Sequence, residues 1–541
     1  MKEILIIISI FFCSSGFAQN EVWFYVVAKD STLNPIFDVS EENIRYTGND
    51  KELKSIFSKY KITTFKKTLK NAKKKNLHKT FFVIANSENL LKELLAAKPK
   101  LFSSGTIIPK KQRKIFEPND YGSTSTIGKN LGLHVNLDYL DFLEVPRAWY
   151  YTVGNPEIIV GISDTSIDTT NLDFAGKIKV IQKSSLGDHG IGVASLAAAK
   201  GDNAFGVPGV CYNCGIYTTK YGAFRSLEIL QELSRAGAKV INCSWVGTFN
   251  IPEVQAEVDE MFKRGTIIVA AAGNRNWEET KFGETLYYPA SYDKVISVSS
   301  AMYKYETIDE NIHYSNNGKK YAENIKGHVG RTMGFVNEDL SQPHIYPVSV
   351  TSLNKEVDLL APSTGTFLYG RYLEKSENFY DLNEHTSNSA PLVTGTIGLM
   401  FSLYPCLPVD EVESILKITS LNIDNIEANR PYAGKYGAGI LNTGRAVEMV
   451  FNMFAEKEPV KIENQRFSRW DFKLTSISEV VIQNQEFTEG ATLEITSKKK
   501  ITISKNTILK PNTNGNIHLK INPELQKECE LQLRDPSILN D

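Results

Sequence analysis

The side chains needed for acyl transfer occur far apart in this sequence, each where an apolar segment ends or begins: Ser387, His189, Asp164 and Asn274. Acyl transfer requires a nucleophile, a base that accepts its proton, a group that orients the base, and hydrogen-bond donors for the oxyanion. A serine, a histidine, an aspartate and an asparagine amide can fill these roles in that order. The residue types therefore predict hydrolysis through a covalent acyl intermediate.

The settings of Asp164 and His189 favour a paired acid and base. Asp164 follows the apolar segment 157–163 (EIIVGIS), where a carboxylate costs desolvation free energy unless a donor such as an imidazole N–H pairs with it. His189 precedes a glycine and a run of very small residues, which predicts a tightly packed helix with the imidazole at its N-terminal end. A turn-capping carboxylate and a structural histidine are the ordinary alternatives for either residue alone.

Asn274 and Ser387 have settings that suit an oxyanion site. Asn274 ends the string AAAGN directly after the apolar segment 266–271, where its amide can donate at the mouth of a sheet. Ser387 precedes the apolar stretch 392–403, and Pro391 is tolerable in the first turns of a helix there. A serine at a helix N-terminus lies beside free backbone N–H groups and the positive end of the helix dipole. A turn asparagine and a serine N-cap are the alternatives, but four such coincidences would have to hold together.

The elements that must position these residues form an α/β pattern. Near-continuous apolar strands are expected at 157–163, 239–244, 266–271 and 294–299, and an amphipathic helix at 253–263 ends at Gly265. Strands that are apolar on both faces require a parallel sheet covered by helices. We therefore predict an α/β fold, a doubly wound and mostly parallel sheet, with ligands at the carboxyl ends of its strands.

The flanking segments have different patterns. Residues 1–18 resemble a secretory signal peptide, 19–115 predict a small α/β module, and 116–130 are a polar linker before the main domain at 131–454. The last segment, 455–541, predicts a small all-β domain of short strands with turns rich in Asn, Gly and Lys. No later segment predicts a transmembrane helix, so a secreted protein (extracellular, periplasmic or at the cell surface) is expected.

Net charge argues against one class of function, and the cysteine count bears on the state of the thiols. The net charge of −1 argues against a nucleic-acid binder, and the basic stretch 70–75 is typical of a solvated face. Five cysteines remain after the signal, an odd number that predicts at least one free thiol or an intermolecular bond in an oxidising compartment. Cys211 and Cys214 form a CxxC string for which a local disulfide and two buried thiols are both open.

The order Asp, His, Asn, Ser with these local strings resembles the subtilisin-like serine peptidases (subtilases) from about Asn119 to Val450. Further strings carry the same resemblance: DNAFGVPGV at 202–210, VINCSW at 240–245, YPA at 288–290, LLAP at 359–362 and YGAGILN at 436–442.

The resemblance implies a serine-type endopeptidase that acts on protein or peptide substrates, with no cofactor required for the chemistry. Asp164 would orient His189, His189 would act as general base and then general acid, Ser387 would be the nucleophile, and Asn274 would complete the oxyanion hole. The implied substrate-binding residues are Ser244, Trp245, Val246 and Gly273. The module 19–115 would be a propeptide that assists folding and blocks the cleft as an intramolecular inhibitor, which makes the chain a zymogen.

Calcium is a further implication of the resemblance. Asp173 and Asn203, in the loop 201–207, match positions that supply side-chain oxygens to a structural calcium in many subtilases. The same two residues are also typical of an ordinary turn.

The sequence departs from the family pattern at several places. The glycine two residues before the nucleophile is replaced by His385, Ser166 follows the acid motif in place of glycine, and Gly192 replaces a second histidine. The segment 303–354 is expected to be a surface insertion near the substrate face. His385 is the main support for the alternative function, a catalytically inactive homologue that acts as a secreted binding protein.

Overall fold

The structure is a computed structural model that describes residues 22–30, 32–40, 43–67, 79–109, 114–121, 137–185, 187–203, 205–222, 226–274, 285–346, 351–366 and 385–540. The expected signal peptide, the basic stretch 70–75 and most of the linker 116–130 lie outside the described residues. The chain divides into two compact units, Met1–Lys114 and Ile115–Asp541.

The first unit is a small α/β module built on an antiparallel sheet. The strand order is β4(Ile62–Lys67), β5(Thr80–Ala85), β1(Val22–Ala28), β6(Phe102–Ile108). Alternate residues of β1, Phe24 and Val26, are fully buried against Leu90 and Leu94 of helix α2. The remaining elements are α1(Lys51–Phe57), α2(Asn89–Ala97) and the hairpin β2(Phe37–Ser40) with β3(Asn43–Tyr46).

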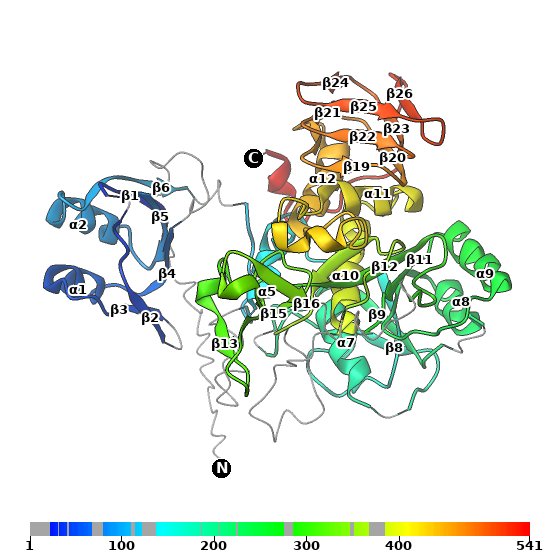
Figure 1. The fold of residues 1–541 in the computed structure, drawn as a ribbon. Coiled ribbons are helices and arrows are strands. Elements are labelled where there is room, and N and C mark those ends of the chain that lie inside the picture. The colour runs from blue at the N-terminus through cyan, green and yellow to red at the C-terminus, as the bar shows by residue number, and fades with distance from the viewer. Residues whose placement is uncertain are drawn as a thin grey trace, which may run out of the picture. The chain divides into compact units, whose positions relative to one another are not determined.

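The second unit is organised around a seven-stranded parallel sheet (Figure 1). Its order is β17(Leu359–Pro362), β12(Val295–Ala301), β11(Ile267–Ala271), β10(Ala238–Cys243), β7(Ile159–Ser163), β9(Gly215–Thr219), β8(Ile178–Val180). Residues of the central strands are buried on both faces, as the near-continuous apolar runs require. The expected doubly wound, mostly parallel sheet is confirmed.

Helices cover both faces of this sheet. Val240 and Val269 belong to the core shared with α7(His189–Ala198) and α10(Thr386–Leu403), whereas their neighbours Ile241 and Ile268 belong to the core shared with α8(Glu228–Arg235) and α9(Pro252–Lys263). Small residues let α7 and α10 approach closely, because a Cβ at Gly395 would lie 2.6 Å from the carbonyl oxygen of Ala197. The helix that carries Ser387 starts at Thr386, earlier than its apolar stretch alone indicates, and Pro391 lies inside it.

Further elements complete the unit around this sheet. The helices are α5(Asp138–Phe142), α6(Val145–Tyr151), α11(Val409–Thr419) and α12(Thr443–Ala455), with short 3-10 turns η4(Ile308–Glu310), η5(Val336–Glu338), η6(Glu427–Tyr432) and η7(Pro536–Asn540). The segment 303–354 contains two hairpins, β13(Ile312–Tyr314) with β14(Lys320–Ala322) and β15(Arg331–Phe335) with β16(Pro343–Tyr346). Within the described part of the chain, no helix combines the length and the apolar character needed to cross a membrane.

The C-terminal strands form a parallel β-helix of three coils (Figure 1, orange to red). Its three ladders are β18(Val460–Glu463), β21(Val480–Gln483), β24(Ile501–Ile503); β19(Arg466–Phe467), β22(Glu486–Glu489), β25(Ile508–Pro511); and β20(Asp471–Ser476), β23(Thr492–Ser497), β26(Ile517–Ile521). Inward-facing residues stack from coil to coil, for example Ile482 over Ile462 and Phe487 over Phe467. The all-β character is confirmed, and the parallel coiling is a finding that the strand pattern did not predict.

Two disulfides and a returning tail fasten this unit. Cys211 is bonded to Cys214, and Cys406 at the end of α10 is bonded to Cys529 beyond the β-helix. Cys243 is a buried free thiol, which confirms that at least one cysteine stays unpaired. After the last coil the chain runs back, where Gln532 N donates to Leu403 O and Arg534 N donates to Tyr151 O at 2.8 and 2.7 Å.

Candidate active site

The expected catalytic residues lie at one edge of the parallel sheet. Asp164 follows β7, Ser244 follows β10, and Gly273 and Asn274 follow β11 as the chain leaves each strand at its carboxyl end. Helices α7 and α10 begin with His189 and with Thr386–Ser387. Because β7, β10 and β11 are parallel neighbours, these segments are brought to the same edge from distant parts of the sequence.

Asp164 and His189 form a hydrogen-bonded pair. The Nδ1 atom of His189 lies 2.8 and 2.9 Å from Oδ1 and Oδ2 of Asp164. The Asp164 side chain is fully buried, and its Oδ1 also accepts the backbone N–H of Thr165 at 2.6 Å. This carboxylate therefore fixes the tautomer in which Nδ1 carries the proton and Nε2 is the basic nitrogen.

The residue after His189 must be very small. A Cβ at Gly190 would lie 2.2 Å from the carbonyl oxygen of Thr165, and Gly190 N donates to Thr165 Oγ1 at 2.7 Å. The start of α7 is thus held against the loop that carries the acid, and this close approach brings the imidazole within hydrogen-bonding distance of the carboxylate.

Tyr221, which the sequence reasoning missed, lies beside this pair. Its hydroxyl is 3.4 Å from Nδ1 of His189, and burial together with the charge and hydrogen bonding of Asp164 holds the pKa of Tyr221 well above its usual value. The phenol is therefore protonated at ordinary pH and can donate to the carboxylate. Its place two residues after β9 was the only signal in the sequence, since β9 neighbours β7 in the sheet.

Ser387 is the second residue of α10 and is nearly buried. Its hydroxyl donates to the carbonyl oxygen of Ser244 at 3.2 Å, and the hydroxyl of Ser244 donates back to the carbonyl oxygen of Ser387 at 2.9 Å. Among the described residues no hydrogen bond joins Ser387 to His189. In this conformation the serine hydroxyl is held at the end of β10 by the carbonyl oxygen of Ser244.

The amide of Asn274 is oriented by Thr386, a second residue that the sequence reasoning missed. The Oδ1 atom of Asn274 accepts both the backbone N–H and the hydroxyl of Thr386 at 2.8 Å, and Gly273 N donates to the same hydroxyl at 3.2 Å. Because a backbone N–H can only donate, the oxygen of Asn274 must face Thr386. The NH₂ group is therefore the end of the amide that does not contact Thr386, and it can donate elsewhere.

The expected substrate-binding residues have different surroundings. Ser244, Trp245 and Val246 continue beyond β10, and Gly247 pairs with Tyr288 through two backbone hydrogen bonds of 2.7 and 2.9 Å. The side chain of Trp245 is buried in the core of the α8–α9 face, and its Nε1 donates to Ser163 Oγ at 3.2 Å. Any contact of Trp245 with a substrate would therefore be made by its backbone.

The residues that depart from the family pattern lie in ordinary backbone settings. His385 is the N-cap of α10, in an extended backbone conformation, and its carbonyl oxygen accepts Asn388 N at 3.0 Å. Ser166 N donates to Ser185 O at 2.9 Å in the loop after the acid, and Gly192 is buried in the first turn of α7.

The loop suggested for calcium holds its own hydrogen bonds, and the buried Lys177 interacts electrostatically with Asp173. Asn203 Nδ2 donates to Asp173 Oδ1 at 2.8 Å, Val207 N donates to Asp173 Oδ2 at 3.3 Å, and Asn203 Oδ1 accepts Phe205 N at 3.0 Å. The ammonium of Lys177 donates to the carbonyl oxygens of Ala198 and Tyr212 at 2.5 and 2.7 Å. Burial lowers the pKa of Lys177 to about 7, against the opposing effect of Asp173.

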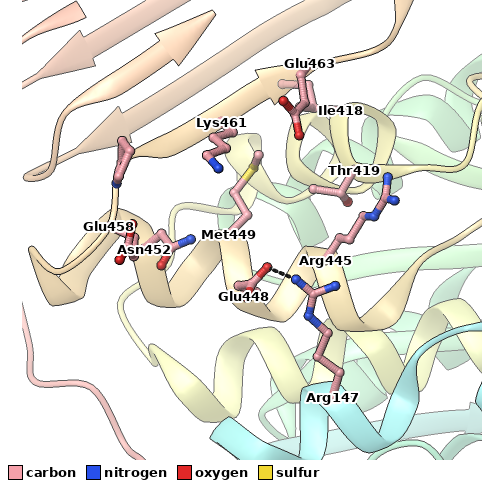
Figure 2. Close-up of a pocket in the computed structure, with 11 residues that line it drawn as sticks. Arg147, Ile418, Thr419, Arg445, Glu448, Met449, Asn452, Glu458, Lys461 and Glu463 are labelled. Atoms are coloured by element: carbon pink, nitrogen blue, oxygen red, sulfur yellow. Dashed lines mark hydrogen bonds and ion pairs between the residues drawn. The ribbon is translucent and has the colours of Figure 1, made fainter. Parts of the chain in front are cut away.

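A hollow of about 410 Å³ lies away from this edge, between α12 and β18 (Figure 2). Figure 2 shows charged side chains of both signs around it, including Arg445, Lys461 and the pair of Arg147 with Glu448. None of the acyl-transfer groups lines this hollow, so it does not belong to the candidate active site. Within the described residues, no cluster of three or more His, Cys, Asp or Glu side chains suited to a metal was found.

Comparison with known proteins gives one family. The model described as "Subtilase family" matches residues 155–445. The chain is 28% identical to subtilisin DY of Bacillus licheniformis over 302 residues, which cover 53% of this chain and 90% of that protein. It is 26% identical to a calcium-dependent protease of Trichormus variabilis over 396 residues, which cover 65% of this chain and 54% of that protein.

Among solved structures, fervidolysin from Fervidobacterium pennivorans, a keratinolytic enzyme related to subtilisin, matches with a TM-score of 0.40 and 18% identity. The match covers 79% of this chain and 61% of that structure.

Proposed function

The chain belongs to the subtilase family and is a subtilisin-like serine endopeptidase, and from that premise we propose that Asp164, His189 and Ser387 are its catalytic triad, with Asn274 in the oxyanion hole. The observation that carries this assignment is that two groups at one edge of the sheet, the His189 imidazole and the Asn274 amide, are each oriented by a different neighbour. The Asp164 carboxylate orients the His189 imidazole, and Thr386 orients the Asn274 amide. Both orientations are ones that acyl transfer requires, because the base must present Nε2 and the amide must present its NH₂.

In the proposed mechanism the hydroxyl of Ser387 turns from Ser244 O towards Nε2 of His189. His189 takes the proton as Ser387 Oγ attacks the peptide carbonyl carbon, and Asp164 stabilises the imidazolium that forms. The Asn274 NH₂ and the backbone N–H of Ser387 donate to the oxyanion. His189 then gives the proton to the leaving amine, and a water molecule repeats the sequence to release the acyl group.

Replacing Ser387 tests this assignment directly. Ser387→Ala is expected to abolish peptide hydrolysis and labelling by a serine-directed phosphonate, with an unchanged circular dichroism spectrum. Ser389→Ala, which removes another hydroxyl of α10 that donates to Ala361 O at 2.9 Å, is the matched control and is expected to stay active and labelled. A wild-type protein that is folded, unlabelled and inactive would support the alternative of a secreted binding protein, for which His385 beside the nucleophile is the motivating observation.

We also propose that residues 1–18 direct secretion and that the module within 19–115 is an inhibitory propeptide. The support is the signal-like N-terminus and a separately folded unit that ends at Lys114, before the peptidase domain begins. Self-processing would make removal of this module depend on Ser387. The Ser387→Ala protein should therefore accumulate at full length, and maturation at the normal rate in a protease-free preparation would contradict self-cleavage.

Asp173 and Asn203, the two residues suggested for calcium, are already engaged in protein hydrogen bonds. Both oxygens of Asp173 and the oxygen of Asn203 accept protein N–H groups, and the Lys177 ammonium already binds two nearby carbonyl oxygens. Calcium requires roughly six to eight oxygen ligands, so its binding would have to compete with these hydrogen bonds. Although a relative is named as calcium-dependent, we expect the melting temperature of this protein to be equal in EDTA and in excess calcium; a calcium-dependent rise that Asp173→Asn removes would contradict this.

A further inference from the structure

The last coil of the β-helix ends in an apolar surface. Its inward-facing residues continue the stacked columns of the coil below, as the registers Ile482 to Ile503 and Ser497 to Ile521 show. Ile482 and Ser497 are fully buried, whereas Ile503 is 53% and Ile521 is 45% exposed. We call the inward-facing residues of this coil the end floor: Ile501, Ile503, Leu509, Ile517, Leu519 and Ile521.

The backbone of this coil is also open. Strands β24, β25 and β26 are each the last member of their ladder, and no further described strand pairs with them. Their outer N–H and C=O groups form three edges at the same end of the β-helix (Figure 1). Repeat proteins ordinarily close such an end with a polar capping repeat, because an exposed apolar edge is a template for another chain. The end floor is aliphatic instead.

The charge of the last coil is of one sign. Residues 498–521 contain no Asp or Glu, whereas 458–494 carry acidic and basic residues together. Lys499 and Lys500 pair with Glu456 and Glu479 of earlier segments. The exposed lysines of this coil that form no ion pair with an acidic side chain among the described residues are here called the rim lysines: Lys505, Lys510 and Lys520.

We propose that the open end of the β-helix binds an acidic, extended polypeptide segment of another protein, which adds a strand to one of these edges. The end floor supplies apolar contacts, the strand edge supplies backbone hydrogen bonds, and the rim lysines select acidic flanks. A second copy stacked end to end would place lysines against lysines, so charge disfavours it. An anionic lipid surface has no backbone groups to satisfy the strand edges, which favours a polypeptide.

The probe for this site is a short fluorescein-labelled peptide of alternating glutamate and valine. It is titrated against full-length Ser387→Ala protein, so that the proposed nucleophile is absent and the peptide stays intact. Saturable binding that weakens with salt is expected. Two control peptides are expected to bind at least about tenfold more weakly. One is the same peptide with alternate backbone nitrogens methylated, and the other is a lysine–valine peptide of equal length.

Two variants locate the binding. The double variant Lys510→Glu/Lys520→Glu reverses two exposed charges of the rim lysines. The double variant Ile503→Asn/Ile521→Asn makes the half-exposed part of the end floor polar. Each double variant is expected to weaken peptide binding by about tenfold. The control is Lys457→Glu with Lys461→Glu, at exposed lysines in and next to the first coil, which should bind as the parent does.

Four results would overturn the proposal: no saturable binding, binding that both open-end variants retain, dimerisation of the protein through this end in light scattering, or binding to phosphatidylglycerol vesicles in place of the peptide. None of these results depends on the catalytic assignment, because the binding is measured without turnover.

Discussion

Asn274 and Thr386 illustrate how single atoms define the site. The N–H of Thr386 is an obligatory donor, so it determines which end of the Asn274 amide remains available for an oxyanion. Asp164, His189, Asn274 and Ser387 could be proposed from the sequence because their types and their places beside apolar segments suit acyl transfer. Thr386 and Tyr221 could not, because their roles arise from contacts between segments that are distant in the chain.

The contact of Tyr221 with the acid–base pair leads to a pH prediction. Tyr221→Phe removes a donor from the Asp164 carboxylate, which then stabilises the imidazolium of His189 more strongly. Because the reaction needs neutral imidazole, the acid limb of kcat/KM is expected to move to higher pH, by about half a unit.

The other titratable groups near this pair are Asp188, the N-cap residue just before α7, and the buried thiol of Cys243, and this variant changes neither. Tyr217→Phe, on the adjoining strand β9, is the matched control and should leave the acid limb of kcat/KM at the same pH. An unshifted limb in Tyr221→Phe would show that the phenol only fills space.

At the scale of elements, helix α11 joins the β-helix to the sheet. The Lys417 ammonium pairs with Asp358, just before β17, at 2.8 Å and lies 4.3 Å from the ring centre of Trp470. Glu411 of the same helix accepts the backbone N–H of Thr475 on β20 at 3.0 Å, while its second oxygen is buried without a hydrogen bond among the described residues. The β-helix is therefore packed against α11 through buried charged groups.

Burial raises the pKa of Glu411 to about 7, and this sets a pH dependence of stability. The raised folded-state pKa favours the protonated acid, so its stabilising contribution is complete below about pH 4.5 and is lost as pH rises through about 7. Glu411→Gln keeps an acceptor for Thr475 and cannot ionise. We expect it to raise the free energy of unfolding at pH 8 by about 1–3 kcal/mol, with little change at pH 4.

Urea denaturation of both proteins at the two pH values measures this difference. Glu413→Gln, two residues further along α11 and more exposed, tests whether the effect is specific to the buried site. A Glu411→Gln protein that gains no stability at pH 8 would contradict the assigned burial effect.

Strand positions in the sheet were predictable because residues such as 267–271 are apolar on both faces, which only a covered parallel sheet accommodates. The coiling of the C-terminal strands was not predicted, because short alternating strands do not indicate which strands pair. A signal was present nevertheless. The string IENQRF at 462–467 recurs as IQNQEF at 482–487, and Asn484 Nδ2 donates to Asn464 Oδ1 at 2.7 Å one coil below.

At the scale of the whole molecule, the chain leaves the sheet domain through α12, forms the β-helix, and returns to the end of α10. The return is fixed by the Cys406–Cys529 disulfide and by Arg534, whose Nε donates to Trp149 O at 3.2 Å and whose guanidinium lies 4.2 Å from the ring centre of Phe116. The sequence predicted an odd thiol but not this connection, because cysteine spacing alone does not identify a partner 123 residues away.

Removing this disulfide should loosen the tail. Cys529→Ser is expected to lower the free energy of unfolding by about 2–5 kcal/mol, since a long loop is no longer closed in the unfolded chain. Differential scanning calorimetry measures the change, and Cys406→Ser, which removes the same disulfide, should reproduce it. Cys243→Ser alters a buried thiol outside any disulfide and serves as the control for cysteine replacement itself. A Cys529→Ser protein as stable as the wild type would show that the tail contacts suffice.

The Cys406–Cys529 disulfide also changes the effect of a backbone cleavage within the β-helix. In a solution of a peptidase, one molecule could cut another at the exposed turns of its β-helix. Because both ends of the β-helix are attached to the same body, one by the backbone and one by sulfur, a single nick there would leave no fragment free to diffuse away. The cut molecule would keep its β-helix, and gel electrophoresis would separate the two fragments only after the disulfide is reduced.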